Sequence, residues 1–85
     1  MRLSDRLREV ERRYCLTARE IDVLGQLLRG KTEKVVATRL GISPQTIRTH
    51  VTHIYLKLGV DGRADLFRVV YGVDREGRGL GRGLE

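Results

Sequence analysis

The sequence lacks the features that define several classes of protein. Among its 85 residues there are no tryptophans, one phenylalanine and three tyrosines, so the core must be small and mostly aliphatic. No apolar run approaches the length needed to cross a membrane, and the arginine-rich start lacks the apolar segment and cleavage site of a secretory signal. The single cysteine, Cys15, cannot form an internal disulfide. These absences favour one small domain in a reducing cytoplasmic location, with no membrane partner.

Positive charge is concentrated in the middle of the chain. The formal net charge is +6, and residues 31–60 hold five Lys or Arg against a single acid, Glu33. Residues 1–20 have a smaller excess, and the other segments balance. A basic patch attracts phosphate polyanions at long range, although a charge of this size is also common on ordinary soluble surfaces. Charge alone therefore leaves two interpretations open: a surface that binds nucleic acid, and the ordinary surface of a soluble protein.

Residues 43–58 have the pattern of an amphipathic helix with an outer face free of acids. Ser43 followed by Pro44 is a helix start, because the serine hydroxyl can cap the first turn and proline is tolerated at the first helical position. The apolar residues recur at spacings of four, three and four and must pack inward: Ile47, Val51, Ile54 and Leu58. The opposite face presents Gln45, Thr49 and Thr52, with Arg48 and His53 on its shoulders. Such side chains suit base edges and phosphates.

Shorter helices are predicted before this segment. Residues 3–14 form a first amphipathic helix, with Ser4 as its expected N-cap. That helix either folds back on the core or, because its apolar residues have heptad spacing, forms a seam with a copy of itself. Thr17 and Glu20 have the spacing of a capping box, which begins a second helix that ends at Gly30.

A glycine turn joins two helices in the middle of the chain. Thr32 is the expected cap of a helix that runs to Leu40 and ends at Gly41, and Ser43 starts the next helix two residues later. Two short helices joined in this way, the second one polar and cationic outside, form a helix-turn-helix. We therefore predict an all-α fold, a four-helix helix-turn-helix bundle with an extra N-terminal helix.

The last helix is predicted from Arg63 to Tyr71, after a C-cap at Gly59. Its expected core residues are Leu66, Val69, Val70 and Val73. Phe67 and Tyr71, four residues apart, are either ordinary core residues or the centre of a dimer contact. Beyond them the chain is rich in glycine and is expected to be flexible. The expected units are an N-terminal helix (1–15), a helix-turn-helix domain (16–73) and a tail (74–85).

The chain from Leu16 to Tyr71 resembles the LuxR/FixJ/NarL class of bacterial helix-turn-helix domains, which includes small regulators of the GerE type. The class has an L-T-x-R-E-x-x-V-L opening, a glycine, then A-x-x-L-x-I-S, T-V-K-x-H and I-x-x-K-L-x-V-x-x-R. The matching residues are Leu16, Thr17, Arg19, Glu20, Val23, Leu24, Gly30, Ala37, Leu40, Ile42, Ser43, Thr46, Ile47, Arg48, His50, Ile54, Lys57, Leu58, Val60 and Arg63. The resemblance implies a transcriptional regulator that binds double-stranded DNA, commonly as a homodimer on paired half-sites, with RNA polymerase as a further candidate partner. It fits either the effector domain of a response regulator or a small stand-alone regulator.

The resemblance also implies roles for single residues. Base reading falls on Arg48, Thr49 and Thr52. Contacts with DNA phosphates fall on Lys34, Gln45, Thr46, His50 and Lys57. Arg48 stands where many members have lysine, and a guanidinium group can bind guanine through two hydrogen bonds. The departures from the pattern are Glu33 for asparagine, Val35 for an acid, Leu66 for a small alanine and Gly62 for Asn or Ser.

Other functions fit the sequence less well. Region 4 of a sigma factor shares the opening and the helix-turn-helix, but the K-L-G-V ending followed by Arg63 favours the LuxR class. A helix-turn-helix used for protein–protein interaction is disfavoured by the polar and cationic outer face, on which only Leu56 is unexplained. No enzyme, cofactor or metal is expected: His50 and His53 have no third ligand nearby in sequence, no glycine loop could hold a nucleotide, and Cys15 suits a small, partly buried side chain.

Overall fold

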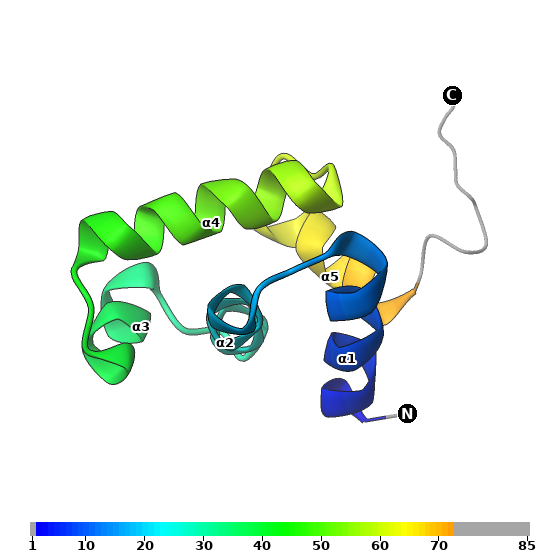
Figure 1. Cartoon of the computed structure of the whole chain (residues 1–85), viewed down its shortest axis with the longest axis horizontal. Coiled ribbons are helices and arrows are strands. Elements are labelled where there is room, and N and C mark those ends of the chain that lie inside the picture. Colours follow the sequence, from blue (N-terminus) through cyan, green and yellow to red (C-terminus); the bar gives the residue numbers. More distant parts are fainter. Residues whose placement is uncertain (1, 73–85) are drawn as a thin grey trace.

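A computed structural model describes residues 2–72 of the chain, and these residues form five α-helices. In chain order the helices are α1 (Leu3–Tyr14), α2 (Ala18–Leu28), α3 (Glu33–Leu40), α4 (Pro44–Leu58) and α5 (Arg63–Tyr71) (Figure 1). The all-α prediction is confirmed, since α2 to α5 form the helix-turn-helix bundle and α1 is the extra helix. Val73, expected in the core, and the predicted tail at 74–85 lie outside the described residues. Within residues 2–72 no helix is long and apolar enough to span a membrane.

Helix α2 lies at the centre of the bundle and contacts each of the other four helices (Figure 1). Its side chains Val23, Leu24 and Leu27 are completely buried. Burial of one such aliphatic side chain stabilises the fold by about 1.5–3 kcal/mol. At one end of the bundle α3 packs on α2 and α4, and at the other end α1 and α5 pack on each other and on α2. Helix α4 contacts α2, α3 and α5, so the shared core holds it along its length.

The predicted starts of three helices are confirmed. Thr17 and Glu20 form the capping box of α2, with bonds of 2.9 and 3.1 Å between side chain and backbone. Thr32 Oγ1 accepts a hydrogen bond from an amide in α3, and Ser43 Oγ accepts one from the amide of Thr46 in α4 at 3.1 Å. These bonds satisfy amide groups that the helix itself cannot pair, so each helix has a fixed first residue.

Ser4 is not the N-cap of α1, contrary to the prediction. The helix begins earlier, with Arg2 in the capping position and with the amides of Asp5 and Arg6 bonded to the Arg2 carbonyl at 3.1 Å. The earlier start places Leu3 on the apolar stripe, where it packs against the core. Apolar packing thus determined the start of α1 more strongly than the preference of a serine hydroxyl.

Gly41 makes the turn between α3 and α4. Its φ of 70° lies in the left-handed region, and the amide of Ile42 bonds to the Ala37 carbonyl at 3.1 Å across the turn. The predicted helix ends at Gly30 and Gly59 also have positive φ. An L-amino acid with a side chain would be strained at Gly41, so this glycine fixes the angle at which α4 leaves α3.

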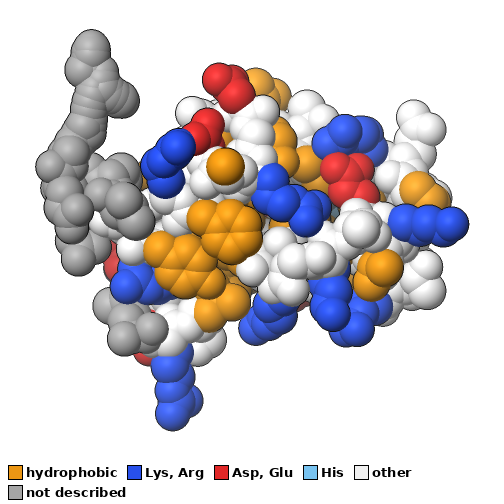
Figure 2. Space-filling model, turned by 180° about the vertical axis from the view of Figure 1, so that it is seen from behind, with side chains coloured by type: hydrophobic (Ala, Val, Ile, Leu, Met, Phe, Trp, Pro, Cys, Tyr) orange, Lys and Arg blue, Asp and Glu red, His pale blue; other side chains and the backbone are white. Residues whose placement is uncertain are grey.

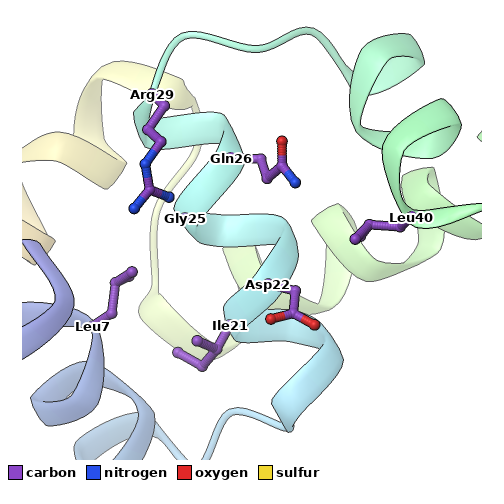
Figure 3. Close-up of a pocket in the computed structure, with 7 residues that line it drawn as sticks. All are labelled: Leu7, Ile21, Asp22, Gly25, Gln26, Arg29 and Leu40. Carbon is purple, nitrogen blue, oxygen red and sulfur yellow. The ribbon is translucent and has the colours of Figure 1, made fainter.

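Gly25 permits the close approach of α1 to α2. A Cβ atom at this position would lie 3.3 Å from Leu7 Cδ1 and 3.0 Å from Arg29 Nη1. Beside this contact is an open groove of about 410 Å³, lined by residues of α1, α2 and α3 (Figure 3): Leu7, Ile21, Asp22, Gly25, Gln26, Arg29 and Leu40. No residue of α4 lines this groove, so it is separate from the outer face of α4.

Cys15 is exposed, not partly buried as the sequence suggested. The residue is the C-cap of α1, with a left-handed φ of 58°, in the short connection to α2. The apolar side chain of this connection that enters the core is its neighbour Leu16, which is buried. The reversal of the chain at the end of α1 therefore leaves the thiol in solvent.

Candidate nucleic-acid interface

The outer face of α4 presents an exposed polar surface without acids, as the sequence predicted. Ile47, Val51 and Ile54 are buried on the inner side of the helix. The three candidate base-reading side chains all lie on the exposed side: Arg48, Thr49 and Thr52. Leu56 also belongs to this surface, and it is the most exposed large apolar residue within the described part of the chain, at 74%.

The two threonines of this surface have their hydroxyl protons in bonds to the helix backbone. Thr49 Oγ1 donates to the Gln45 carbonyl at 3.2 Å, and Thr52 Oγ1 donates to the Arg48 carbonyl at 2.9 Å. Each hydroxyl oxygen retains acceptor capacity, and each side chain has a methyl group. In a major groove such side chains can accept from the amino groups of adenine or cytosine and can contact the methyl group of thymine.

Arg48 is held by an acid from the neighbouring helix. Its Nη2 atom donates to Glu33 Oε2 at 2.8 Å, and Glu33 is the first residue of α3. The two side chains remain accessible, with 59% of Arg48 and 32% of Glu33 exposed. The principal cation of the outer face is therefore oriented by an ion pair that crosses the helix-turn-helix.

Lys57 binds within the protein at the other end of α4. Its Nζ atom lies 2.8 Å from Glu20 Oε1 and donates to the Cys15 carbonyl at 3.1 Å. An ammonium group has three N–H donors, so these two bonds leave one for an outside acceptor. The side chain joins the end of α4 to the start of α2 and is only about one-third exposed, at 35%.

Glu20 is the only buried charged residue among those described, at 3% exposed. Burial by itself raises the pKa of its carboxyl group. The hydrogen bonds from Lys57 and the Thr17 amide, with the positive charges of Lys57 and His53, outweigh burial and bring the pKa of Glu20 below its ordinary value. Glu20 is thus a carboxylate that both caps α2 and anchors α4.

The other candidate phosphate contacts lie near the helix-turn-helix. Lys34 is exposed on α3, Gln45 and Thr46 are exposed in the first turn of α4, and His50 is half-buried one turn later. The start of a helix favours anions through its amide groups and its dipole. No group of three or more metal-binding side chains comes together within residues 2–72.

The aromatic pair on α5 lies at the edge of the core. The rings of Phe67 and Tyr71 are stacked, with centroids 6.0 Å apart and an interplanar angle of 10°, and both residues are half-buried. The Arg6 guanidinium of α1 lies 5.5 Å from the centroid of the Tyr71 ring. Figure 2 shows hydrophobic side chains gathered on the face that includes α5, with basic side chains around them.

The sequence did not reveal the acidic partners of Arg48 and Lys57, which are Glu33 and Glu20. It identified Glu33 as the single acid of residues 31–60 and as a departure from the family pattern, and Glu20 as part of a capping box and of the family pattern, but it assigned neither a partner on α4. Their partners lie 15 and 37 positions away in the chain, so no local spacing indicated either pair. The unmatched charge on Arg48 and Lys57 was the only available signal.

Comparison with known proteins gives a consistent family. The sequence model of bacterial regulatory proteins of the luxR family matches residues 14–70. The uncharacterized transcriptional regulatory protein YhcZ of Bacillus subtilis is 44% identical over 70 residues, which are 80% of this chain and 33% of that protein. The spore germination protein GerE of Bacillus subtilis is 40% identical over 57 residues, which are 67% of this chain and 77% of that protein.

Several relatives are longer than the matched segment. The probable transcriptional regulatory protein NarL of Mycobacterium tuberculosis is 43% identical over 49 residues, which are 58% of this chain and 23% of that protein. The chain therefore spans about a third of the length of YhcZ and a quarter of NarL, but most of GerE. No solved structure matches it significantly.

Proposed function

The chain belongs to the luxR family of bacterial regulatory proteins, and we propose that it controls transcription by placing α4 in the major groove of specific DNA sites. Its helix-turn-helix is the DNA-binding domain of that family and is not an enzyme. The observation that carries the proposal is the outer face of α4, which is exposed and free of acids from one end to the other. In the whole protein, the domain acts either as a small stand-alone regulator or as the effector domain of a response regulator.

Base reading is proposed for Arg48, Thr49 and Thr52. These residues lie on consecutive turns of the exposed face, where an α-helix in the major groove meets base edges. Arg48 can donate two parallel hydrogen bonds to guanine, whereas the threonines offer an acceptor and a methyl group. We therefore expect guanine at the position that faces Arg48.

Phosphate contacts are proposed for the residues around this face: Lys34, Gln45, Thr46, His50 and Lys57. Lys34 and the first turn of α4 are exposed at one end of the surface, and the third N–H donor of Lys57 is available at the other. Contacts of this kind fix the position of a protein on DNA without reading sequence. They predict binding that weakens steeply with salt.

A homodimer on paired half-sites is proposed, with Phe67 and Tyr71 in the contact. Both rings are half-buried by the chain itself and form a flat stacked surface on α5. Sedimentation of the protein with one half-site and with two should yield a dimer on two. A Phe67→Ser, Tyr71→Ser variant that still dimerises on two half-sites would contradict this contact.

RNA polymerase is a further proposed partner once DNA is bound, with the exposed Leu56 as the residue to test.

The central test is an electrophoretic mobility shift with genomic fragments, titrated with salt. We expect binding at low salt on any duplex, and tighter binding on a subset of fragments at higher salt. The logarithm of the affinity should fall linearly with the logarithm of salt, by about 0.9 for each phosphate contacted. A protein that binds no duplex even at low salt would refute the proposed function.

A further inference from the structure

We propose that Glu33 is a positioning residue for Arg48, which makes that guanidinium selective for guanine over DNA phosphates. The inference rests on the proposed DNA-binding function and extends it to a residue outside α4. Its starting point is the 2.8 Å hydrogen bond from Arg48 Nη2 to Glu33 Oε2. Glu33 is also the only acid in residues 31–60, and it stands where the family pattern has asparagine.

The ion pair fixes the direction of a long side chain. Glu33 lies in the first turn of α3, where the helix dipole favours a carboxylate, and Arg48 lies on the exposed side of α4. No other partner of the Arg48 side chain occurs in the described part of the chain. One of the five N–H donors of the guanidinium is used, so four remain for DNA. A side chain that is already oriented loses less conformational entropy when it binds.

The charge of Glu33 determines which acceptor suits the oriented guanidinium. A phosphate brought near Arg48 also comes near the Glu33 carboxylate, and the two negative charges repel each other. The N7 and O6 atoms of guanine have no formal charge and escape most of this repulsion. Glu33 therefore lowers the affinity of Arg48 for DNA backbone more than its affinity for guanine, which is a gain in specificity through a repulsive element.

Two substitutions separate the charge of Glu33 from its hydrogen bond. Glu33→Gln keeps an acceptor for Arg48 but removes the charge, and Glu33→Ala removes both. Glu9→Gln is the matched control, because Glu9 is an exposed acid on α1, at the other end of the bundle (Figure 1). The probes are a short duplex selected by the wild-type protein from a randomised pool, the same duplex with the guanine facing Arg48 replaced, and a scrambled duplex.

We expect Glu33→Gln to bind the scrambled duplex more tightly than wild type and to steepen its salt dependence by up to about 0.9. Glu33→Ala should in addition reduce the preference for guanine, by a share of the roughly 5- to 150-fold that one bidentate base contact supplies. In an Arg48→Ala background the Glu33→Ala change should no longer affect base preference. A purely structural role for Glu33 would leave base preference unchanged in both backgrounds.

The inference fails if both Glu33 variants match Glu9→Gln on all three duplexes. It also fails if Glu33→Ala changes base preference equally with and without Arg48. Those results would leave the proposed function intact, because the wild-type protein would still select its duplex. A wild-type protein that selects no duplex would instead overturn the proposed function and this inference together.

Discussion

Lys57→Met tests the partly buried ion pair that joins the end of α4 to the start of α2. Methionine keeps much of the length of the lysine side chain but removes its charge and its two hydrogen bonds, to Glu20 Oε1 and to the Cys15 carbonyl. Among residues 2–72, the buried Glu20 carboxylate then keeps only the Thr17 amide at hydrogen-bond distance, with His53 Nδ1 3.9 Å from Oε2. The variant should therefore be less stable than wild type at neutral pH.

The size of this loss follows from the exposure of the pair. Removal of one partner of a fully buried ion pair costs about 3–5 kcal/mol. The Lys57 side chain is about one-third exposed and Glu20 keeps its backbone bond, so we expect about 2 kcal/mol. For a domain of this size, that loss lowers the midpoint of thermal unfolding by about 8–16 °C.

The pH dependence distinguishes this explanation from a loss of packing. In the wild type the pKa of Glu20 lies below its ordinary value of 4.5, so its contribution to stability is fully present above that pH and disappears as the pH falls through the folded pKa. Lys57→Met removes two of the four effects that lower the pKa of Glu20, so this pKa should be higher in the variant than in the wild type, and protonation relieves the variant as the pH falls. The difference in stability between the wild type and Lys57→Met should become smaller as the pH falls from neutral to about 4.

Circular dichroism melts at several pH values measure this difference. Lys34→Met is the control, because Lys34 is an exposed lysine whose ammonium group has no partner among residues 2–72, and it should change stability by no more than about 0.5 kcal/mol. The proposed role of Glu20 as an anchor is refuted if Lys57→Met and the wild type unfold at the same temperature at neutral pH. It is also refuted if the difference between their unfolding midpoints does not change with pH.

Three other substitutions test other parts of the structure. Arg48→Ala should weaken binding to the selected duplex by about 1–3 kcal/mol and relax its base preference in a binding titration, and an equal loss on random DNA would contradict a base-reading role. Gly25→Val should destabilise the fold by about 1–3 kcal/mol in urea denaturation, because the added atoms meet Leu7 Cδ1, and unchanged stability would show that α1 does not pack there. Ser43→Ala should cost about 1 kcal/mol through loss of the α4 cap, measured in the same way, and a neutral effect would mean that the cap contributes nothing.

The sequence predicted those parts of the structure that depend on neighbouring residues. Both ends of α4 are confirmed, because Ser43 and Pro44 start the helix and Gly59 ends it by local backbone chemistry. The same local reasoning was wrong for Ser4, where the packing of Leu3 extended α1. It was also wrong about the exposure of Cys15, which depends on how the chain turns between two helices.

The candidate site was predicted only in part, because its geometry depends on contacts between distant positions. The helical pattern gave the exposed face of α4, and the family resemblance selected Arg48, Thr49 and Thr52 on it as candidates for base reading. The pattern could not show that Arg48 meets Glu33 across the turn or that Lys57 meets Glu20, because those contacts arise from the packing of three helices. The roles of these residues on DNA remain predictions.

The bonds from Lys57 to Glu20 and to the Cys15 carbonyl fix α4 at the end that lies far from Arg48, in addition to the core contacts along the helix. Arg48 precedes Lys57 by nine positions, which corresponds to about 13 Å along a helix. Over that distance, a tilt of α4 by about 5° about the Lys57 end moves Arg48 by about 1 Å, which is more than the roughly 0.5 Å tolerance of a functional site. A substitution at Glu20 or Lys57 that leaves the domain folded should therefore make the position of Arg48 relative to the DNA bases less precise. Such a substitution should lower selectivity between DNA sequences although neither residue contacts a base.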